Sequence, residues 1–220
     1  FWGPFSQRSA AAVAEATLHQ LQSLQEKSLL QIQGERFDFH ALLRQFAAEK
    51  LAEYPEGDKA VVRHSHYYLQ AVADLGGALN GEMPHLAVQR IAGAWENVKG
   101  AWETAVARSD LDHLLAALIP LSDFCQIRGF YGEGLTLFAQ VAAGVSAAQQ
   151  PEALAQLLTQ QAAMHVRLSQ YPQAIKLIEQ ALPLTADAWL KARLQITWGE
   201  TLWRQGSLAE AEPKLHDALA

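Results

Sequence analysis

The chain of 220 residues is 50% hydrophobic and carries a formal net charge of −6, so it is long enough to bury a sizeable core. Nucleic-acid-binding domains normally present basic surfaces, so the negative charge argues against a dedicated DNA or RNA reader. A single cysteine, Cys125, excludes an intramolecular disulfide framework, and no Cys/His cluster suggests a metal site. The longest apolar stretch, Leu114 to Leu121, is far shorter than the roughly 20 residues of a membrane-spanning helix. These properties predict a cytoplasmic protein with no membrane partner.

Because the chain begins at Phe1 without Met, we expect it to be a fragment of a longer protein.

The first predicted elements follow the order of a winged helix. Apolar residues recur at helical spacing from Ser6 to Glu26, which indicates two short helices. Apolar and polar residues then alternate from Ser28 to Phe39 around Gly34, which predicts a β-hairpin. A further helix is expected from His40 to Glu53, before Pro55. One face of that helix is expected to carry Leu42, Leu43, Phe46, Ala47 and Leu51.

The charge of this segment argues against DNA binding by the hairpin. Residues 1–54 carry five basic and six acidic side chains, a net charge of −1. A protein that reads duplex DNA releases counterions through basic contacts to phosphates, so its surface is normally positive. We therefore expect no direct nucleic-acid partner for this chain.

From residue 55 onward the sequence predicts only helices, separated by Gly, Pro and Ser-Asp punctuation. Two helix starts carry the spacing of a capping box, Ser109 with Asp112 and Ser207 with Glu210. The expected organisation is the C-terminal part of a winged helix over 1–54, a helical linker over 55–108, and helical repeats over 109–220.

The last part of the chain contains an internal repeat. Small residues recur at intervals of twelve and seven residues, and the two clear units are offset by 37 residues. The small residues of these units are Ala162, Ala174 and Ala181 in the first and Gly199, Ala211 and Ala218 in the second. A weaker unit precedes them with Ser122, Gly134 and Val141. This spacing resembles the tetratricopeptide repeat, in which small residues let two antiparallel helices pack closely. The predicted fold class is therefore mainly α: a partial winged helix with a short β-hairpin, followed by an α-solenoid of tetratricopeptide-like helical pairs.

No arrangement of residues points to catalysis. The sequence has no phosphate-binding loop of the form GxxxxGK[ST], no GxSxG nucleophile elbow, no HExxH motif and no EF-hand loop. His64 and His66 are two residues apart, so on a helix they point in different directions and cannot chelate one ion together. We expect this chain not to be an enzyme and to hold no metal.

Two sequence blocks carry a resemblance to a family. RFDFHALLRQFAAEKL, followed by RHSHYYLQAV, resembles the end of the winged-helix portion of bacterial signal-transduction ATPases with numerous domains (STAND), relatives of the NB-ARC switch proteins. The block from Glu96 to Val141 is similar to the linker that joins the switch to a sensor array in this group. The resemblance implies that the ATPase core lies before Phe1, and that ADP or ATP with Mg²⁺ is a cofactor of the longer parent and not of this chain.

The resemblance also implies a role for His40. The matching histidine in the family contacts the β-phosphate of ADP and locks the inactive state, and Ala41 stands where the family carries an acidic residue. Arg44, one helical turn later, is a second candidate for positioning that anion. The open alternative is that His40 only caps the helix that follows the hairpin.

Arginines recur in the repeats. Arg167 and Arg204 each follow the first small residue of their unit by five positions, and Arg128 lies near the same row. We expect these arginines to line a face that binds a protein, a peptide or a small-molecule inducer, although a solvated helix face is the open alternative. The predicted function is a regulatory and sensor fragment whose repeats act on the parent's own nucleotide-binding domain. The alternatives are a plain tetratricopeptide scaffold that binds peptides, or part of a winged-helix transcriptional regulator.

Overall fold

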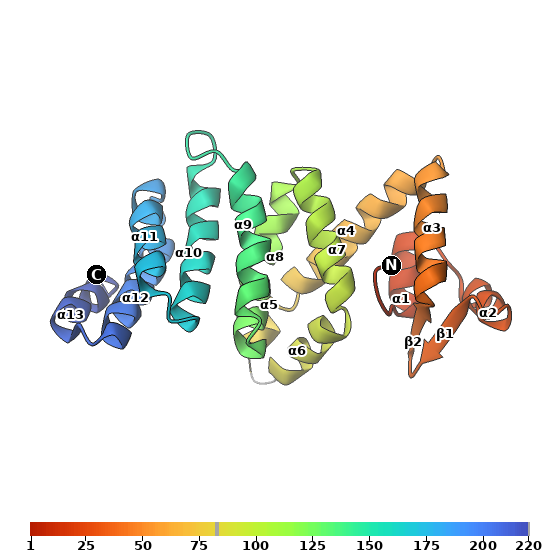
Figure 1. Cartoon of the computed structure of the whole chain (residues 1–220), viewed down its shortest axis with the longest axis horizontal. Helices are drawn as coiled ribbons and strands as arrows, with labels where there is room; N and C mark the ends of the chain where they lie inside the picture. The colour runs from red at the N-terminus through yellow and green to blue at the C-terminus, as the bar shows by residue number, and fades with distance from the viewer. Residues whose placement is uncertain (82–83, 220) are drawn as a thin grey trace. The chain divides into compact units, whose positions relative to one another are not determined.

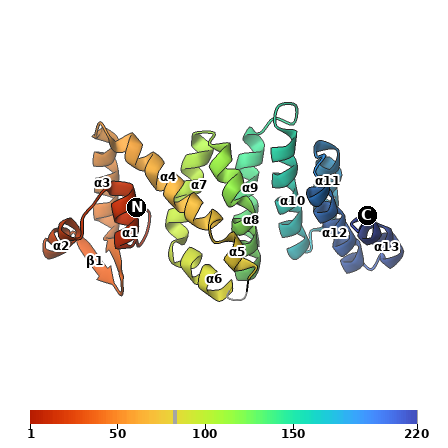
Figure 2. The same ribbon diagram turned by 180° about the vertical axis from the view of Figure 1, so that it is seen from behind.

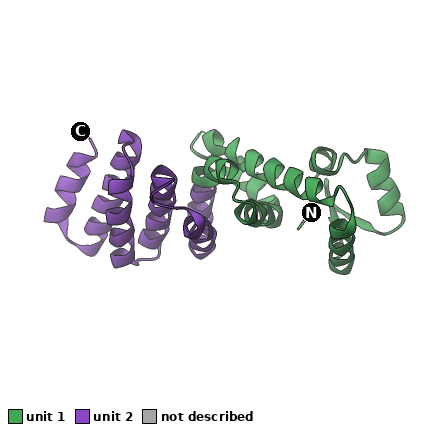
Figure 3. Cartoon of the chain, turned by 90° about the horizontal axis from the view of Figure 1, so that it is seen from above, with its two compact units in different colours: residues 1–120 green, residues 121–220 purple. Residues whose placement is uncertain are grey.

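The computed structural model describes residues 1–81 and 84–219 and is mainly α, with one short antiparallel hairpin near the N-terminus (Figure 1). The backbone contacts divide the chain into two compact units, residues 1–120 and residues 121–220, so the division falls inside one helix, α8 (Figure 3). The boundaries predicted at 54/55 and 108/109 both lie in turns between helices, and the three-part organisation stays a prediction.

The first unit contains the hairpin and most of the shorter helices. Its elements are α1 (Gln7–Ala14), α2 (Leu18–Glu26), β1 (Leu30–Gln33), β2 (Arg36–Phe39), α3 (Ala41–Glu53), α4 (Gly57–Ala73), α5 (Gly76–Leu79), α6 (Pro84–Gly93) and α7 (Trp95–Ala107). The second unit contains the end of α8 (Leu111–Arg128), then α9 (Tyr131–Gly144), α10 (Pro151–Arg167), α11 (Tyr171–Ala181), a 3₁₀ turn (Leu182–Leu184), α12 (Ala188–Gln205) and α13 (Leu208–Asp217).

The predicted hairpin is confirmed. Leu30 pairs with Phe39 and Gln33 with Arg36, and Gly34 in the turn has φ of +61°, a conformation that glycine adopts without a Cβ clash. The two short helices before it are confirmed as well. Each begins with a reciprocal capping box, in which Ser6 and Thr17 bond the amides three residues later, so unpaired first-turn donors are satisfied.

Phe5 of the N-terminal segment pairs with β2 like a third strand beside the hairpin. The sequence did not predict this pairing. Phe5 and Phe37 exchange two backbone hydrogen bonds of 2.8 Å in an antiparallel bridge. The Phe5 ring stacks on Phe37, and a small core forms around the two rings. The buried members of this core are Phe5, Ala10, Leu21, Leu30 and Phe37.

Asn97 of α7 forms hydrogen bonds with the backbone of the N-terminal segment before α1. Its side chain is fully buried, its oxygen accepts from the amides of Trp2 (2.8 Å) and Gly3 (3.3 Å), and its nitrogen donates to the Pro4 carbonyl (3.0 Å). The ring of His64 on α4 lies 3.2 Å from the same oxygen. Burial, reinforced by the charge of the Phe1 amino group, lowers the pKa of His64 to about 4, so its imidazole is neutral at pH 7.

Helix α3 differs from expectation in how little of it is covered. Its bounds match the prediction, but none of its residues is fully buried, and Leu42 and Phe46 of the predicted apolar face are 73% and 57% exposed. The apolar spacing marked a helix correctly, but spacing alone does not say whether a neighbouring element covers the face.

Helices of the second unit pack in antiparallel pairs, α10 with α11 and α12 with α13 (Figure 2). The small residues of the first clear repeat, Ala162, Ala174 and Ala181, are fully buried. In the second repeat a Cβ on Gly199 would lie 2.5 Å from the Leu215 side chain, so glycine permits this close approach. Five of the six small residues of the two clear repeats are therefore buried between helices, whereas Ala218 lies in the turn after α13 and is half-buried.

The third, weaker unit follows the same packing. Ser122 and Val141 are buried, and a Cβ on Gly134 of α9 would lie 3.4 Å from the Cβ of Cys125 on α8. Cys125 is fully buried in this contact, and burial raises the pKa of its thiol to about 12, with the Glu133 carboxylate adding to the shift.

Both predicted capping boxes in the helical part are wrong. Ser109 has φ of +56° and lies two residues before α8. Asp110, and not Ser109, is therefore the residue that immediately precedes the helix. Ser207 does precede α13, but its side chain makes no cap hydrogen bond. The spacing of a capping box recurs by chance in helical sequences, and the backbone of the preceding turn decides whether the side chain can reach the amides.

Among the described residues, no helix combines the length and the apolar character needed to cross a lipid bilayer.

Candidate functional site

A polar row links the first helices of the three helical pairs in the second unit. Arg167 of α10 reaches Glu200 of α12 at 3.4 Å and Gln126 of α8 at 3.5 Å. Arg204 of α12 donates to the same Glu200 oxygen at 2.9 Å. The structure therefore brings two of the three predicted arginines together around one carboxylate, on a face shared by α8, α10 and α12.

A second set of contacts extends this face. Arg193 of α12 lies 3.9 Å from Asp123 of α8 and donates to the Gln160 side chain of α10 at 3.3 Å. Gln160 is almost completely buried, and its amide nitrogen has no hydrogen-bond partner among the described residues. We refer to Gln126, Arg167, Glu200, Arg204, Asp123, Gln160 and Arg193 as the α8–α10–α12 face.

Aromatic and aliphatic side chains on α12 border this face. Trp189, Ile196 and Trp203 are separated by seven residues each and are at least 50% exposed. Because seven residues are close to two helical turns, the three side chains form one stripe along α12. The guanidinium groups of Arg193 and Arg204 lie over the Trp189 and Trp203 rings at 5.3 and 6.0 Å. Trp and Arg are the residues that most often dominate binding energy at protein interfaces.

The charges of the face do not cancel. Arg167, Arg193 and Arg204 face Glu200 and Asp123, so one positive charge is in excess. The ion pairs are partly exposed, and such pairs contribute only about 0.2–1 kcal/mol each to stability. A ligand carboxylate can therefore compete for these guanidinium groups at little cost to the fold.

Arg128 is not part of the α8–α10–α12 face. It is exposed at the end of α8, and its guanidinium group lies 5.5 Å from the Phe130 ring centroid. Its position six residues after Ser122, instead of five, rotates it around α8 relative to the other two arginines.

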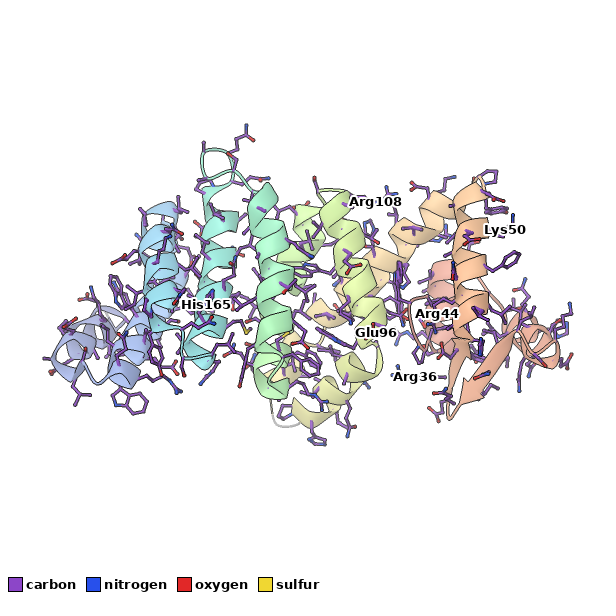
Figure 4. All side chains as sticks on the ribbon, viewed as in Figure 1. Arg36, Arg44, Lys50, Glu96, Arg108 and His165 are labelled. Atoms are coloured by element: carbon purple, nitrogen blue, oxygen red, sulfur yellow. The ribbon has the colours of Figure 1, made fainter. Side chains whose placement is uncertain are left out.

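In the first unit, His40 and Arg44 lie at the start of α3, and Figure 4 labels Arg44 on this helix. His40 is exposed, and its side chain makes no capping hydrogen bond, so the alternative reading of His40 as a side-chain cap is not supported. The Arg44 guanidinium donates to Asp38 at 2.6 Å and to the Phe39 carbonyl at 3.2 Å. Arg44 therefore ties α3 to the hairpin, while His40 is left accessible.

An apolar hollow of about 990 Å³ lies beside Arg44 in the same unit. It is lined from α1, α2, α3, α4 and the hairpin, by residues that include Ala10, Leu21, Phe39, Ala48 and Val61. Helix α3 lines this hollow with residues such as Ala48 and Leu51, whereas the strongly exposed Leu42 and Phe46 do not line it.

Sequence reasoning missed a cluster formed by His66, Asp110 and His113. His66 of α4 lies 2.9 Å from one Asp110 oxygen, and His113 of α8 lies 2.9 Å from the other. The two imidazole rings are stacked, with centroids 3.9 Å apart and planes 8° apart. Burial of Asp110 raises its pKa, but the hydrogen bonds and charge of His113 and the bond from His66 outweigh this effect, so the pKa lies below its usual range. His64 lies on the same helix as His66 and points in another direction, whereas the partners of His66 lie forty-four residues or more away in sequence.

No protein-family model, no curated protein and no solved structure matches this chain.

Proposed function

We propose that this chain is the regulatory and sensor part of a cytoplasmic STAND-type ATPase, and that its helical repeats bind an acidic protein or peptide segment. The observation that carries the proposal is the α8–α10–α12 face, with clustered arginines beside exposed tryptophans. Arginine forks bind carboxylates in two-point geometry, and exposed Trp side chains supply apolar contact at low entropic cost.

The proposed partners are the parent's own nucleotide-binding domain and an inducer that competes with it. Either would offer carboxylates to Arg167 and Arg204, which already share Glu200. Binding of one partner would displace the other, so occupancy of the face would be coupled to the nucleotide state of the parent. In the first unit, the small sheet of Phe5, β1 and β2 with its flanking helices supports the winged-helix part of the proposal.

Replacing both Arg167 and Arg204 with alanine is expected to weaken binding of a fluorescein-labelled peptide of alternating Glu and Leu about tenfold. Each partly exposed contact contributes about 0.5–1 kcal/mol, and raising the salt concentration should reduce the difference because exposed charges are screened. Fluorescence anisotropy at two salt concentrations measures both effects.

The matched control replaces the exposed Arg8 and Arg90 of the first unit, which changes net charge by the same amount. If the control pair weakens peptide binding as much as the Arg167/Arg204 pair, the attraction is general and the face has no special role. Equal binding by the Arg167/Arg204 variant and the unmodified chain would also contradict the proposal.

For the longer parent, His40→Ala is expected to speed ADP release about tenfold. An exposed imidazole at the start of α3 can donate to a phosphate oxygen, and a charge-assisted hydrogen bond contributes about 1.5–3 kcal/mol. Release of a fluorescent ADP analogue in stopped flow measures the rate, and His19→Ala, at an exposed position of α2, is the control. Unchanged ADP release would leave the peptide-binding scaffold, without a nucleotide switch, as the function of the chain.

A further inference from the structure

We infer that His66, Asp110 and His113 form a binding site for a divalent transition-metal ion, of which Zn²⁺ is the best match. The three side chains come from two parts of the first unit: His66 lies on α4, and Asp110 and His113 lie three residues apart at the start of α8. Arg108, labelled in Figure 4, marks the end of α7 two residues before Asp110.

The distances between the ligand atoms are close to those of a metal centre. One ligand atom from each residue lies within 4.8 Å of the other two, and both histidine nitrogens lie 2.9 Å from an Asp110 oxygen. Two ligands at about 2.0–2.1 Å from a tetrahedral Zn²⁺ are about 3.4 Å apart. Bringing the two histidine nitrogens to that separation takes at most about 1.4 Å of relative movement.

The donor set selects among metal ions. Two imidazole nitrogens and one carboxylate oxygen suit Zn²⁺, Co²⁺ or Ni²⁺, whereas Mg²⁺ and Ca²⁺ prefer sites made of oxygen ligands. Three protein ligands leave a fourth tetrahedral position for water. All three side chains are half-buried, so an ion can reach them from solvent.

The hydrogen bonds of the metal-free cluster show which ring nitrogens face Asp110. Asp110 accepts at both oxygens, so the imidazole nitrogens that face it, Nε2 of His66 and Nδ1 of His113, are the ones that would bind the ion. A neutral imidazole carries one N–H, so metal binding moves that proton to the opposite ring nitrogen, Nδ1 of His66 and Nε2 of His113. No net proton is released from neutral rings, and the negative charge of Asp110 offsets half of the charge of the ion.

The two rings must turn to bind one ion, because the lone pair of an imidazole nitrogen lies in the ring plane and the planes of His66 and His113 are parallel in the metal-free cluster. The hydrogen bond from His113, in the first turn of α8, would by itself pair the Asp110 carboxylate. The His66 ring on α4 nevertheless lies parallel to the His113 ring, with centroids 3.9 Å apart. Two imidazolium rings in this geometry would repel, and a metal ion holds both rings in their neutral, ligating form.

The test is calorimetric titration of the chelator-treated chain with ZnCl₂, together with Co²⁺ absorption spectra. We expect one Zn²⁺ per chain, tetrahedral Co²⁺ bands in the visible region, and a rise in melting temperature with Zn²⁺ that Mg²⁺ does not produce. His66→Ala and His113→Ala should each weaken Zn²⁺ binding at least tenfold and abolish the Co²⁺ bands.

His66→Gln provides a second variant in case the alanine variants fail to fold. Glutamine can keep a hydrogen bond to Asp110 but is a poor zinc ligand, so this variant should fold and still lose the metal. The control is His165→Ala on α10, a half-buried histidine outside the cluster, because the chain has eight histidines and any accessible one can bind zinc weakly. The inference is overturned if the unmodified chain binds no Zn²⁺, if His66→Gln binds it as tightly as the unmodified chain, or if His165→Ala causes the same loss.

Discussion

Alanine in place of Asn97 is expected to lower the free energy of unfolding of the first unit by about 4 kcal/mol. The fully buried Asn97 side chain bonds the backbone of Trp2, Gly3 and Pro4 and the ring of His64. Alanine would leave the Gly3 amide and the His64 ring buried without this partner, and the amide of Trp2 and the carbonyl of Pro4 partly buried. Each unpaired buried group costs about 1–3 kcal/mol unless water reaches it. The cost is therefore several times that of a typical surface substitution.

Urea denaturation followed by tryptophan fluorescence and by circular dichroism measures this loss. The two units can unfold separately, so the transition of the first unit must be resolved from that of the second. Asn80→Ala on the surface is the matched control, and we expect it to change stability by less than about 1 kcal/mol. A loss below about 1 kcal/mol for Asn97→Ala would mean that the N-terminal segment is held by other contacts.

The Cys125 thiol is expected to react with a thiol reagent at least about 1,000-fold more slowly in the native chain than in the unfolded chain at pH 8. Burial raises its pKa from the ordinary 9.0 to about 12, which lowers the thiolate fraction by about three powers of ten. The fully buried position also blocks approach of the reagent, so reaction proceeds only through opening of the α8–α9 contact. The reaction rate of the native thiol should rise with pH, because its thiolate becomes abundant only as the pH approaches 12.

Ellman's reagent in native buffer and in urea gives the two rates. A control chain with Cys125→Ala and Ser146→Cys places the thiol on the exposed turn after α9 and should react quickly in both conditions. If native Cys125 reacted within tenfold of this exposed thiol, the packing of α8 against α9 would be open for much of the time.

Local patterns predicted the hairpin and the helices well. The alternation around Gly34 and the small residues at the repeat positions each describe one face of one element, and the structure follows them except at Ala218, which is half-buried in the turn after α13. Ala162 and Ala174 illustrate the reason: a small residue at a fixed interval is needed wherever two helices approach closely, whatever the rest of the fold.

Contacts between distant segments could not be predicted in the same way. The Phe5–Phe37 bridge, the hydrogen bonds of Asn97 and the meeting of His66 with Asp110 each join residues that are thirty-two or more positions apart. A single Phe, Asn or His has no periodicity, so its partner is known only once the helices are placed. For Arg167 and Arg204 the repeat supplied that placement, because equivalent positions in successive units fall on one face.

Helix α3 has no fully buried residue, and this has a consequence for the hydrogen exchange of its amides. Its link to the hairpin depends on the Arg44–Asp38 pair. Few apolar contacts have to break for α3 to open, so its amides should exchange with deuterium sooner than those of α4 and α7, whose buried residues pack together. We therefore expect α3, which follows His40, to unfold locally as a separate unit. A molecule that binds the apolar face of the docked helix would suppress that opening, and the open population would lower its apparent affinity, without a change in the remainder of the first unit.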